Sequence, residues 1–205
     1  MAFCAIYKRT FIYNRATMAR PRSIPDQIVL DQALVLMRRA GPEGVSFAAL
    51  TAEIGLSPAT LVQRFGSKAG LLEATLAHAW SALEVRTAAE GATVTRNPAG
   101  AVAWLVALSG GYGDGDDYAD GLLVLREDLI DPALRQRGVA WFETIATILG
   151  DCLGDAAGPR PDLGRLMVAQ WQGAVLLAGF DRRRPVAETV EADLKAWCRA
   201  IGRQA

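Results

Sequence analysis

The chain has 205 residues, of which 51% are hydrophobic, and its 22 Lys/Arg and 22 Asp/Glu residues give a formal net charge of zero. This length suits one large domain, or a small domain joined to a medium one, and the apolar content allows a substantial core. Because there is no apolar run of roughly 18 residues or more, we expect no membrane span and no membrane partner. Lys8 and Arg9 interrupt any signal-peptide core, so a cytoplasmic protein is expected.

The charge is unevenly distributed along the chain. Residues 1–68 contain nine Lys/Arg and four Asp/Glu, a net charge of +5, whereas residues 69–205 contain thirteen and eighteen, a net charge of −5. This asymmetry indicates a basic N-terminal part that meets a polyanion and an acidic remainder that does not.

Cysteine and histidine usage argues against a metal site or a catalytic centre. Cys4, Cys152 and Cys198 are widely separated and form no CxxC pair, so neither a zinc site nor a disulfide framework is indicated. His78 is the single histidine, which leaves little room for a Ser/His/Asp arrangement. We therefore expect no enzymatic activity, no cofactor and no bound metal.

The first predicted helix follows Ser23-Ile-Pro-Asp26, a sequence that resembles a capping box. Its apolar residues recur at i, i+3, i+4 and i+7, which is one face of a helix: Leu30, Ala33, Leu34 and Met37. Gly41 and Pro42 are expected to end it.

Two short helices follow. Ser46 is placed to cap the first, whose inward residues are Phe47, Leu50 and Ile54, and Gly55 closes it. Ser57 caps the next helix, with Pro58 at the first helical position and with Leu61 and Phe65 inward. Ser67 then caps a long helix.

Helical periodicity continues to the C-terminus, so the predicted fold class is all-α. Asn97-Pro98 and Asp131-Pro132 each predict a further helix start. Loops are predicted at residues 110–117 and 154–161, where glycine, aspartate and proline are concentrated.

Residues 46–65 have the pattern of a helix-turn-helix. Gly55 permits the tight reversal, Leu56 fills the angle between the helices, and the N-terminal half of the second helix is left to project into a major groove. The outward residues of that helix are Ser57, Thr60, Gln63 and Arg64, with Val62 at the flank. Gln pairs with adenine and Arg with guanine, although an ordinary solvated helix face would also expose both side chains.

The segment Ser46 to Lys68 resembles the DNA-binding signature of the TetR (tetracycline-repressor) family. Ser57, Thr60, Leu61, Phe65, Ser67 and Lys68 are in register with that signature. The resemblance implies a three-helix DNA-binding domain, preceded by a basic arm and followed by a helical effector-binding and dimerisation domain. The residues expected at DNA are Arg20, Arg22, Ser46, Ser57, Pro58, Thr60, Val62, Gln63, Arg64, Ser67 and Lys68.

The sequence departs from the family signature at two positions that matter for DNA contact. Val62 replaces the usual tyrosine and cannot donate a hydrogen bond to a phosphate. Arg64 replaces the usual second aromatic residue or histidine and can offset the loss with a charge-assisted contact.

The domain boundaries are predicted from the same resemblance. Residues 18–68 are expected to form the DNA-binding domain, and residues 69–205 the effector-binding and dimerisation domain. Met18 looks like the natural start, which would make residues 1–17 a disordered or non-native extension; a longer DNA-binding arm is the alternative.

The two C-terminal helices are expected to form a dimer interface. Residues 166–180 are apolar nearly all round, and the last helix carries an apolar stripe from Val186 to Ile201. Packing inside the protomer is the alternative, but a single helix-turn-helix reads only half of a palindromic site. The expected interface residues are Gly173, Ala174, Val190, Leu194, Trp197 and Ile201.

Large apolar side chains with few charges suggest a pocket for an apolar or aromatic effector. The candidate wall residues are Trp104, Leu122, Leu125, Trp141, Phe142, Ile145, Trp171 and Gln172. Gln172 is an interior polar group whose partner could be the ligand.

These observations predict a sequence-specific DNA-binding transcription regulator that acts as a homodimer on a palindromic operator. We expect a repressor released by its effector, although an activator would have the same sequence features. The competing hypothesis is a helical small-molecule-binding protein or enzyme with a vestigial DNA-binding head.

Overall fold

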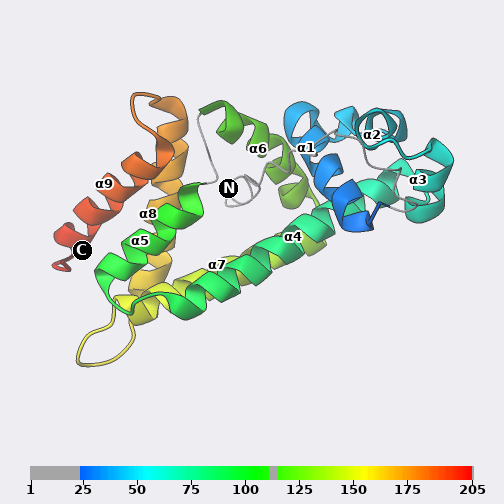
Figure 1. The fold of residues 1–205 in the computed structure, drawn as a ribbon. Helices are drawn as coiled ribbons and strands as arrows, with labels where there is room; N and C mark the ends of the chain where they lie inside the picture. Colours follow the sequence, from blue (N-terminus) through cyan, green and yellow to red (C-terminus); the bar gives the residue numbers. More distant parts are fainter. Residues whose placement is uncertain (1–23, 111–114, 205) are drawn as a thin grey trace. The chain divides into compact units, whose positions relative to one another are not determined.

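The computed structural model describes residues 24–110 and 115–204, and these residues are almost entirely helical (Figure 1). The all-α prediction is therefore confirmed. The helices are α1 (Asp26–Gly44), α2 (Phe47–Ile54), α3 (Pro58–Phe65), α4 (Lys68–Thr93), α5 (Pro98–Ser109), α6 (Gly115–Ile130), α7 (Pro132–Cys152), α8 (Pro161–Phe180) and α9 (Val186–Ala200).

The described residues divide into two compact units, 24–82 and 83–204. The first contains α1, α2, α3 and the beginning of α4, and the second contains the end of α4 together with α5 to α9. The division falls inside α4, whereas the predicted domain boundary after Lys68 coincides with the beginning of that helix. The predicted boundary stays a prediction.

Serine side chains cap the beginnings of α2, α3 and α4, as predicted. The Oγ atoms accept backbone N–H groups three residues later: Ser46 from Ala49 at 3.0 Å, Ser57 from Thr60 at 3.2 Å and Ser67 from Gly70 at 3.1 Å. Each bond satisfies one of the N–H groups that a helix start leaves without a partner.

The ends of α1 are partly as predicted. Its helical dihedral angles break at Gly41, where φ is 66°, and this confirms the predicted end; Pro42 then begins a last short turn. The predicted capping box is wrong, because α1 begins at Asp26 behind an N-cap Pro25, which has no side-chain oxygen to offer. Ser23 lies outside the described residues.

The predicted loop at residues 110–117 is too long at its C-terminal end. Helix α6 begins at Gly115, so residues 115–117 are helical. The concentration of glycine and aspartate in this segment suggested a loop, but the segment also contains the first turn of α6, where acidic residues are compatible with the helix dipole.

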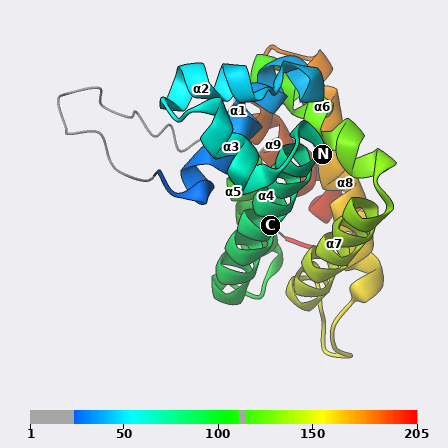
Figure 2. The same ribbon diagram turned by 90° about the vertical axis from the view of Figure 1, so that its right-hand side faces the viewer.

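Helix α8 is central to the packing of the second unit. It packs against α7 and α9, and α9 also packs against α5 (Figure 2). The approach of α7 and α8 is close at Gly164: a Cβ there would overlap the carbonyl oxygen of Ala146 and lie 2.7 Å from the nitrogen of Gly150. Only glycine allows these two helices to lie so near to each other.

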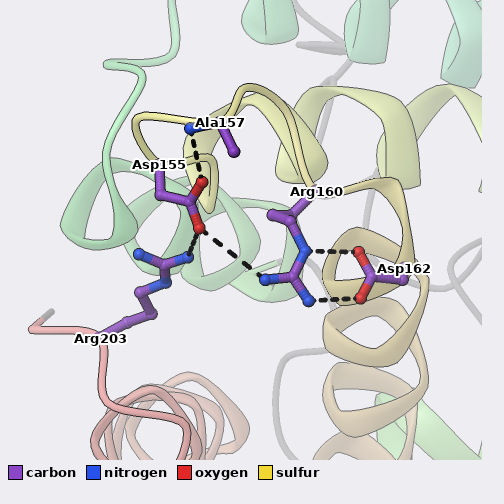
Figure 3. Close-up of polar contacts among 5 residues, drawn as sticks. All are labelled: Asp155, Ala157, Arg160, Asp162 and Arg203. Carbon is purple, nitrogen blue, oxygen red and sulfur yellow. Dashed lines mark hydrogen bonds and ion pairs between the residues drawn. The ribbon is translucent and has the colours of Figure 1, made fainter.

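The loop between α7 and α8 is tied to the segment that follows α9 (Figure 3). Arg203 donates to Asp155 Oδ2 at 2.8 Å, and the backbone N–H of Ala157 donates to Oδ1 of the same carboxylate at 3.0 Å. Arg160 forms two hydrogen bonds with Asp162, at 2.9 and 2.6 Å. The Arg203 hydrogen bond is the main reason why the pKa of Asp155 lies below its usual value.

Two of the cysteines, Cys152 and Cys198, are buried free thiols in the second unit. Burial raises the pKa of both thiols, which disfavours the reactive thiolate. Cys4 lies outside the described residues. Within the described ranges, none of the helices has the length and apolarity needed to cross a membrane.

The contact at Gly164 leads to a stability prediction. Gly164→Ala should lower the free energy of unfolding by about 2–3 kcal/mol, because the new methyl group meets backbone atoms that cannot rotate away. Gly110→Ala is the matched control: its φ is −59° and a Cβ there meets nothing within 4 Å, so the change should be under about 1 kcal/mol. Urea unfolding of both variants measures the difference, and equal stabilities would contradict the proposed close approach.

Candidate nucleic-acid interface

A glycine turn joins two short helices in the first unit. Gly55 has left-handed backbone angles, φ 73° and ψ 12°, which a residue with a side chain adopts only with strain. Leu50 of α2 and Leu61 of α3 are completely buried, while Leu56 in the turn is half-buried. One face of each helix is therefore packed, and the other face of α3 is left at the surface.

The exposed face of α3 contains several of the residues predicted at DNA. Ser57, Pro58 and Gln63 are exposed, and Val62 retains 45% of its accessible surface. Thr60 is half-buried, and its hydroxyl lies 2.9 Å from the hydroxyl of Ser57. Gln63 consequently offers a complete side-chain amide to a ligand, while the two hydroxyl groups are already engaged with each other.

Arg64 points toward the beginning of α1. Its Nη1 donates to the carbonyl oxygen of Ile24 at 2.6 Å and to Oδ1 of Asp26 at 3.0 Å, and the side chain is 22% exposed. Sequence reasoning missed this contact because the partners are about 40 residues away and local spacing contains no sign of them. The predicted role of Arg64 at DNA stays a prediction.

Lys68, the first residue of α4, lies beside Glu43. Its Nζ is 3.3 Å from the carboxylate and 3.4 Å from the carbonyl oxygen of that residue. The Glu43 side chain is 96% exposed, so this pair is screened by water and contributes little. An incoming phosphate could replace the carboxylate at small cost.

The remaining predicted DNA contacts are of two kinds. Ser46 and Ser67 cap α2 and α4, so their hydroxyl groups already accept a backbone hydrogen bond. Arg20 and Arg22 lie outside the described residues.

Hydrogen bonds connect two buried tryptophans of the second unit to hydroxyl groups. Trp141 Nε1 donates to Thr87 Oγ1 at 2.9 Å, and Trp171 Nε1 donates to Ser109 Oγ at 2.7 Å. The rings of Trp141 and Trp171 lie 6.2 Å apart, and Phe142 packs edge-on against Trp141 at 5.0 Å. These candidate effector residues therefore lie together.

Other candidate effector residues differ in their surroundings. Ile145 is completely buried, and Trp104 is 5% exposed with an Nε1 that has no hydrogen-bond partner among the residues that the structure describes. Both amide atoms of Gln172 are also buried without a partner. Leu122 is 41% exposed and Leu125 is half-buried, because Tyr118 and Val124 form the inward face of α6. The predicted role of Leu122 and Leu125 in an effector pocket stays a prediction.

Comparison with known protein families gives a match in the first unit. The sequence profile of the family described as "Bacterial regulatory proteins, tetR family" matches residues 29–75, which run from α1 into α4. Residues 29–75 therefore carry the DNA-binding helix-turn-helix domain of TetR-family regulators. The comparison with curated proteins gave no match.

Two solved structures have the same fold over most of their length. The first is a putative transcriptional regulator from Saccharomonospora viridis in complex with choline, with a TM-score of 0.63 and 21% identity. The alignment covers 83% of this chain and 93% of that one. The second is a putative TetR-family transcriptional regulator from Mesorhizobium loti MAFF303099, with a TM-score of 0.62, 15% identity, and coverage of 85% and 95%.

The function that follows at this level is DNA-binding transcriptional regulation by a helix-turn-helix domain. The family match covers the residues that form the turn and α3, including the exposed side chain of Gln63. The segment that matches the family lies in the first unit, which is followed by a helical second unit.

The predicted dimer residues of the second unit are partly inaccessible. Ala174, Val190 and Leu194 are 0–1% exposed, because α8 and α9 pack against each other and α9 also packs against α5. For these three, packing inside the protomer leaves no side-chain surface for a partner. Gly173, Trp197 and Ile201 keep partial exposure.

Helix α8 has an exposed apolar stripe that sequence reasoning missed. It consists of Leu166, Gly173, Leu177 and Phe180, and the three larger residues are 56%, 62% and 83% exposed respectively. Their spacing of seven, four and three residues is helical and could have revealed the stripe. Sequence analysis did not single out this stripe, because residues 166–180 are apolar on nearly all sides. The sequence does not show which of these sides is covered by other helices.

The exposure of Gln63 on α3 and of Lys68 at the start of α4 leads to a prediction that distinguishes base contact from phosphate contact. Gln63→Ala should relax the preference at one position of each half-site, by roughly 1–3 kcal/mol, with little change in non-specific binding. Lys68→Ala should weaken binding to all DNA and lower the salt slope by about one per subunit. Titration against preferred and scrambled duplexes at several salt concentrations distinguishes them, and equal weakening of both duplexes by Gln63→Ala would refute base contact.

Proposed function

We propose that this TetR-family regulator is a homodimeric repressor that binds a palindromic operator and is released by a small apolar or aromatic effector. The observation that carries the proposal is the exposed face of α3, with Gln63 outward on a helix whose other face is buried. Residues 18–68 would bind DNA and residues 69–205 would dimerise and bind the effector, in the cytoplasm.

Selection of duplexes from a random pool tests the DNA-binding part of the proposal. The protein should enrich an inverted repeat whose half-sites are about 10 base pairs apart, centre to centre, or a multiple of this. Two chains should bind per repeat. A reporter gene placed behind the selected sequence should then lose expression when the regulator is present; increased expression would indicate an activator instead.

Buried polar groups in the second unit favour an effector that carries a hydrogen-bond acceptor. Trp104 Nε1 and the Gln172 amide are buried polar groups without a partner, and each such group costs free energy unless something pairs with it. The aromatic residues Trp141, Phe142 and Trp171 form an apolar neighbourhood in the same unit. The Saccharomonospora viridis structure shows that a protein of this fold holds a small molecule.

Two Trp→Phe variants test whether Trp104 has an unsatisfied donor. Both variants remove the same volume, but only Trp141→Phe leaves a hydroxyl, that of Thr87, buried without its donor. Trp141→Phe should therefore lower the free energy of unfolding by about 1–3 kcal/mol more than Trp104→Phe does. Denaturant unfolding without effector gives both values, and an equal loss would show that Trp104 has a hydrogen bond of similar worth.

Helix α4 provides a route from the effector domain to DNA. It starts with Lys68 directly after α3, and its C-terminal part is bound to α7 by two contacts. Arg137 forms hydrogen bonds of 2.9 and 2.7 Å with Glu84, which raise its pKa, and Thr87 accepts from Trp141. A ligand that shifts α7 would therefore act on the part of α4 that belongs to the second unit.

The exposed stripe on α8 supports dimerisation. Leu166, Leu177 and Phe180 would place apolar surface in water, and contiguous apolar surface of this kind marks an association site. At Gly173 a Cβ would meet nothing within 4 Å, so a second helix could approach closely there. We propose a second copy of this chain as the occupant, because a palindromic operator needs two heads.

A charge on the stripe should produce monomers. Leu177→Glu should shift the protein from dimer to monomer at micromolar concentration, because it would bury an unpaired carboxylate in the interface. Val139→Glu on α7 is the matched control, since Val139 and Leu177 are both 62% exposed. Sedimentation velocity measures the outcome; a monomeric unmodified protein, or monomers from Val139→Glu alone, would contradict the assigned face.

A further inference from the structure

The two cations that follow Gln63 in the chain are held in different ways. Arg64 is 22% exposed and gives its Nη1 to two acceptors, the carbonyl oxygen of Ile24 at 2.6 Å and Asp26 at 3.0 Å. Lys68 is 41% exposed and lies 3.3 Å from one carboxylate, that of Glu43, which is almost wholly in water. The sequence alone presents both simply as basic residues at a DNA-binding helix.

The difference between the partners of Arg64 and Lys68 decides which of the two side chains can leave its position to contact DNA. If Arg64 left its position, the partly buried carbonyl of Ile24 would lose a charge-assisted hydrogen bond, and such groups are costly to leave unpaired. Lys68 would exchange an exposed carboxylate for a phosphate, and an exposed ion pair is worth little. Lys68 is therefore free to change partner when DNA arrives, whereas Arg64 is not.

We propose that Arg64 is a positioning residue that holds α3 to the beginning of α1 and does not itself contact DNA. Its neighbour Gln63 lies on the exposed side of the same helical turn, so the angle at which Gln63 meets a groove depends on this link. The link also holds the chain at Ile24, two and four residues after Arg22 and Arg20. The inference rests on the proposed DNA-binding function and concerns how specificity is achieved.

The alternatives make different predictions for salt dependence and for partner variants. A phosphate contact from Arg64 would lower the salt slope by about one per subunit when removed, and lysine would replace it well. A base contact would relax one position and would not depend on Asp26. If Arg64 is a positioning link, removing it leaves the salt slope unchanged, and removing Asp26 has a similar effect on specificity. Lysine should not replace Arg64, because the link requires the fixed donor directions of a guanidinium.

The experiment uses the full-length protein and two duplexes: one selected by the unmodified protein from random DNA, and a scrambled duplex of the same composition. The variants are Arg64→Ala, Arg64→Lys, Asp26→Ala and the double variant Arg64→Ala/Asp26→Ala, with Lys68→Ala as the control for phosphate contact. Affinities are measured at several salt concentrations and well below the melting temperature of every variant.

The expected result is a loss of specificity without a change in salt slope. Arg64→Ala should lower the ratio of selected to scrambled affinity by about tenfold, equivalent to about 1.4 kcal/mol. Arg64→Lys should not restore the ratio, and Asp26→Ala should lower it too. The double variant should be no worse than Arg64→Ala alone, because both changes break one link. Lys68→Ala should instead weaken both duplexes and lower the slope.

Three results would overturn the proposal. The first is a lower salt slope with Arg64→Ala that Arg64→Lys restores, since this shows a phosphate contact. The second is a lower ratio with Arg64→Ala while Asp26→Ala has no effect, since this shows a base contact. The third is an unchanged ratio in every variant. If Arg64→Ala does not fold, the affinity ratio and the salt slope of Arg64→Lys and Asp26→Ala test the proposal in its place. Failure of the unmodified protein to select any sequence would instead remove the DNA-binding function on which the proposal rests.

Discussion

The DNA-binding part of this protein depends on the burial of one face of two very short helices. Helices α2 and α3 have eight residues each, and helices of that length are not stable alone in water. They persist because Leu50 and Leu61 are fully buried and because Ser46 and Ser57 satisfy the helix starts. The left-handed turn at Gly55 then fixes the direction of α3 and leaves Gln63 outward.

The same short helices explain why electrostatic links matter in this unit. Helix α3 has only eight residues, with Leu61 as its fully buried side chain, and Arg64 adds two hydrogen bonds from α3 to the beginning of α1. The N-terminal part of the chain is basic overall, yet Asp26 and Glu43 accept hydrogen bonds from Arg64 and Lys68. The two pairs differ, because Asp26 is 61% exposed and shares Arg64 with the carbonyl oxygen of Ile24, whereas the Glu43 side chain is 96% exposed.

In the second unit, packing and hydrogen bonding serve different purposes. Gly164 brings α7 and α8 together closely, and the salt-bridged loop at Asp155 holds the end of the chain against their connection. Trp141 and Trp171 are buried with satisfied N–H groups, which makes them rigid parts of the core. Trp104 and Gln172 lack such partners, and this distinguishes the groups that could recognise a ligand from those that only fill space.

The sequence by itself determined the starts of α2, α3, α4, α5 and α7, the glycine turn and the family of the helix-turn-helix. Capping and turn formation depend on residues within about four positions of each other, so local spacing contains the information. Only the tertiary structure decided where Arg64 points, which side of α8 stays exposed and that Val190 and Leu194 are used inside the protomer. These outcomes depend on partners far away in the chain: α1 for Arg64, α7 for α8, and α5 and α8 for α9. An apolar stripe shows that a helix face will be covered, but it does not show by what.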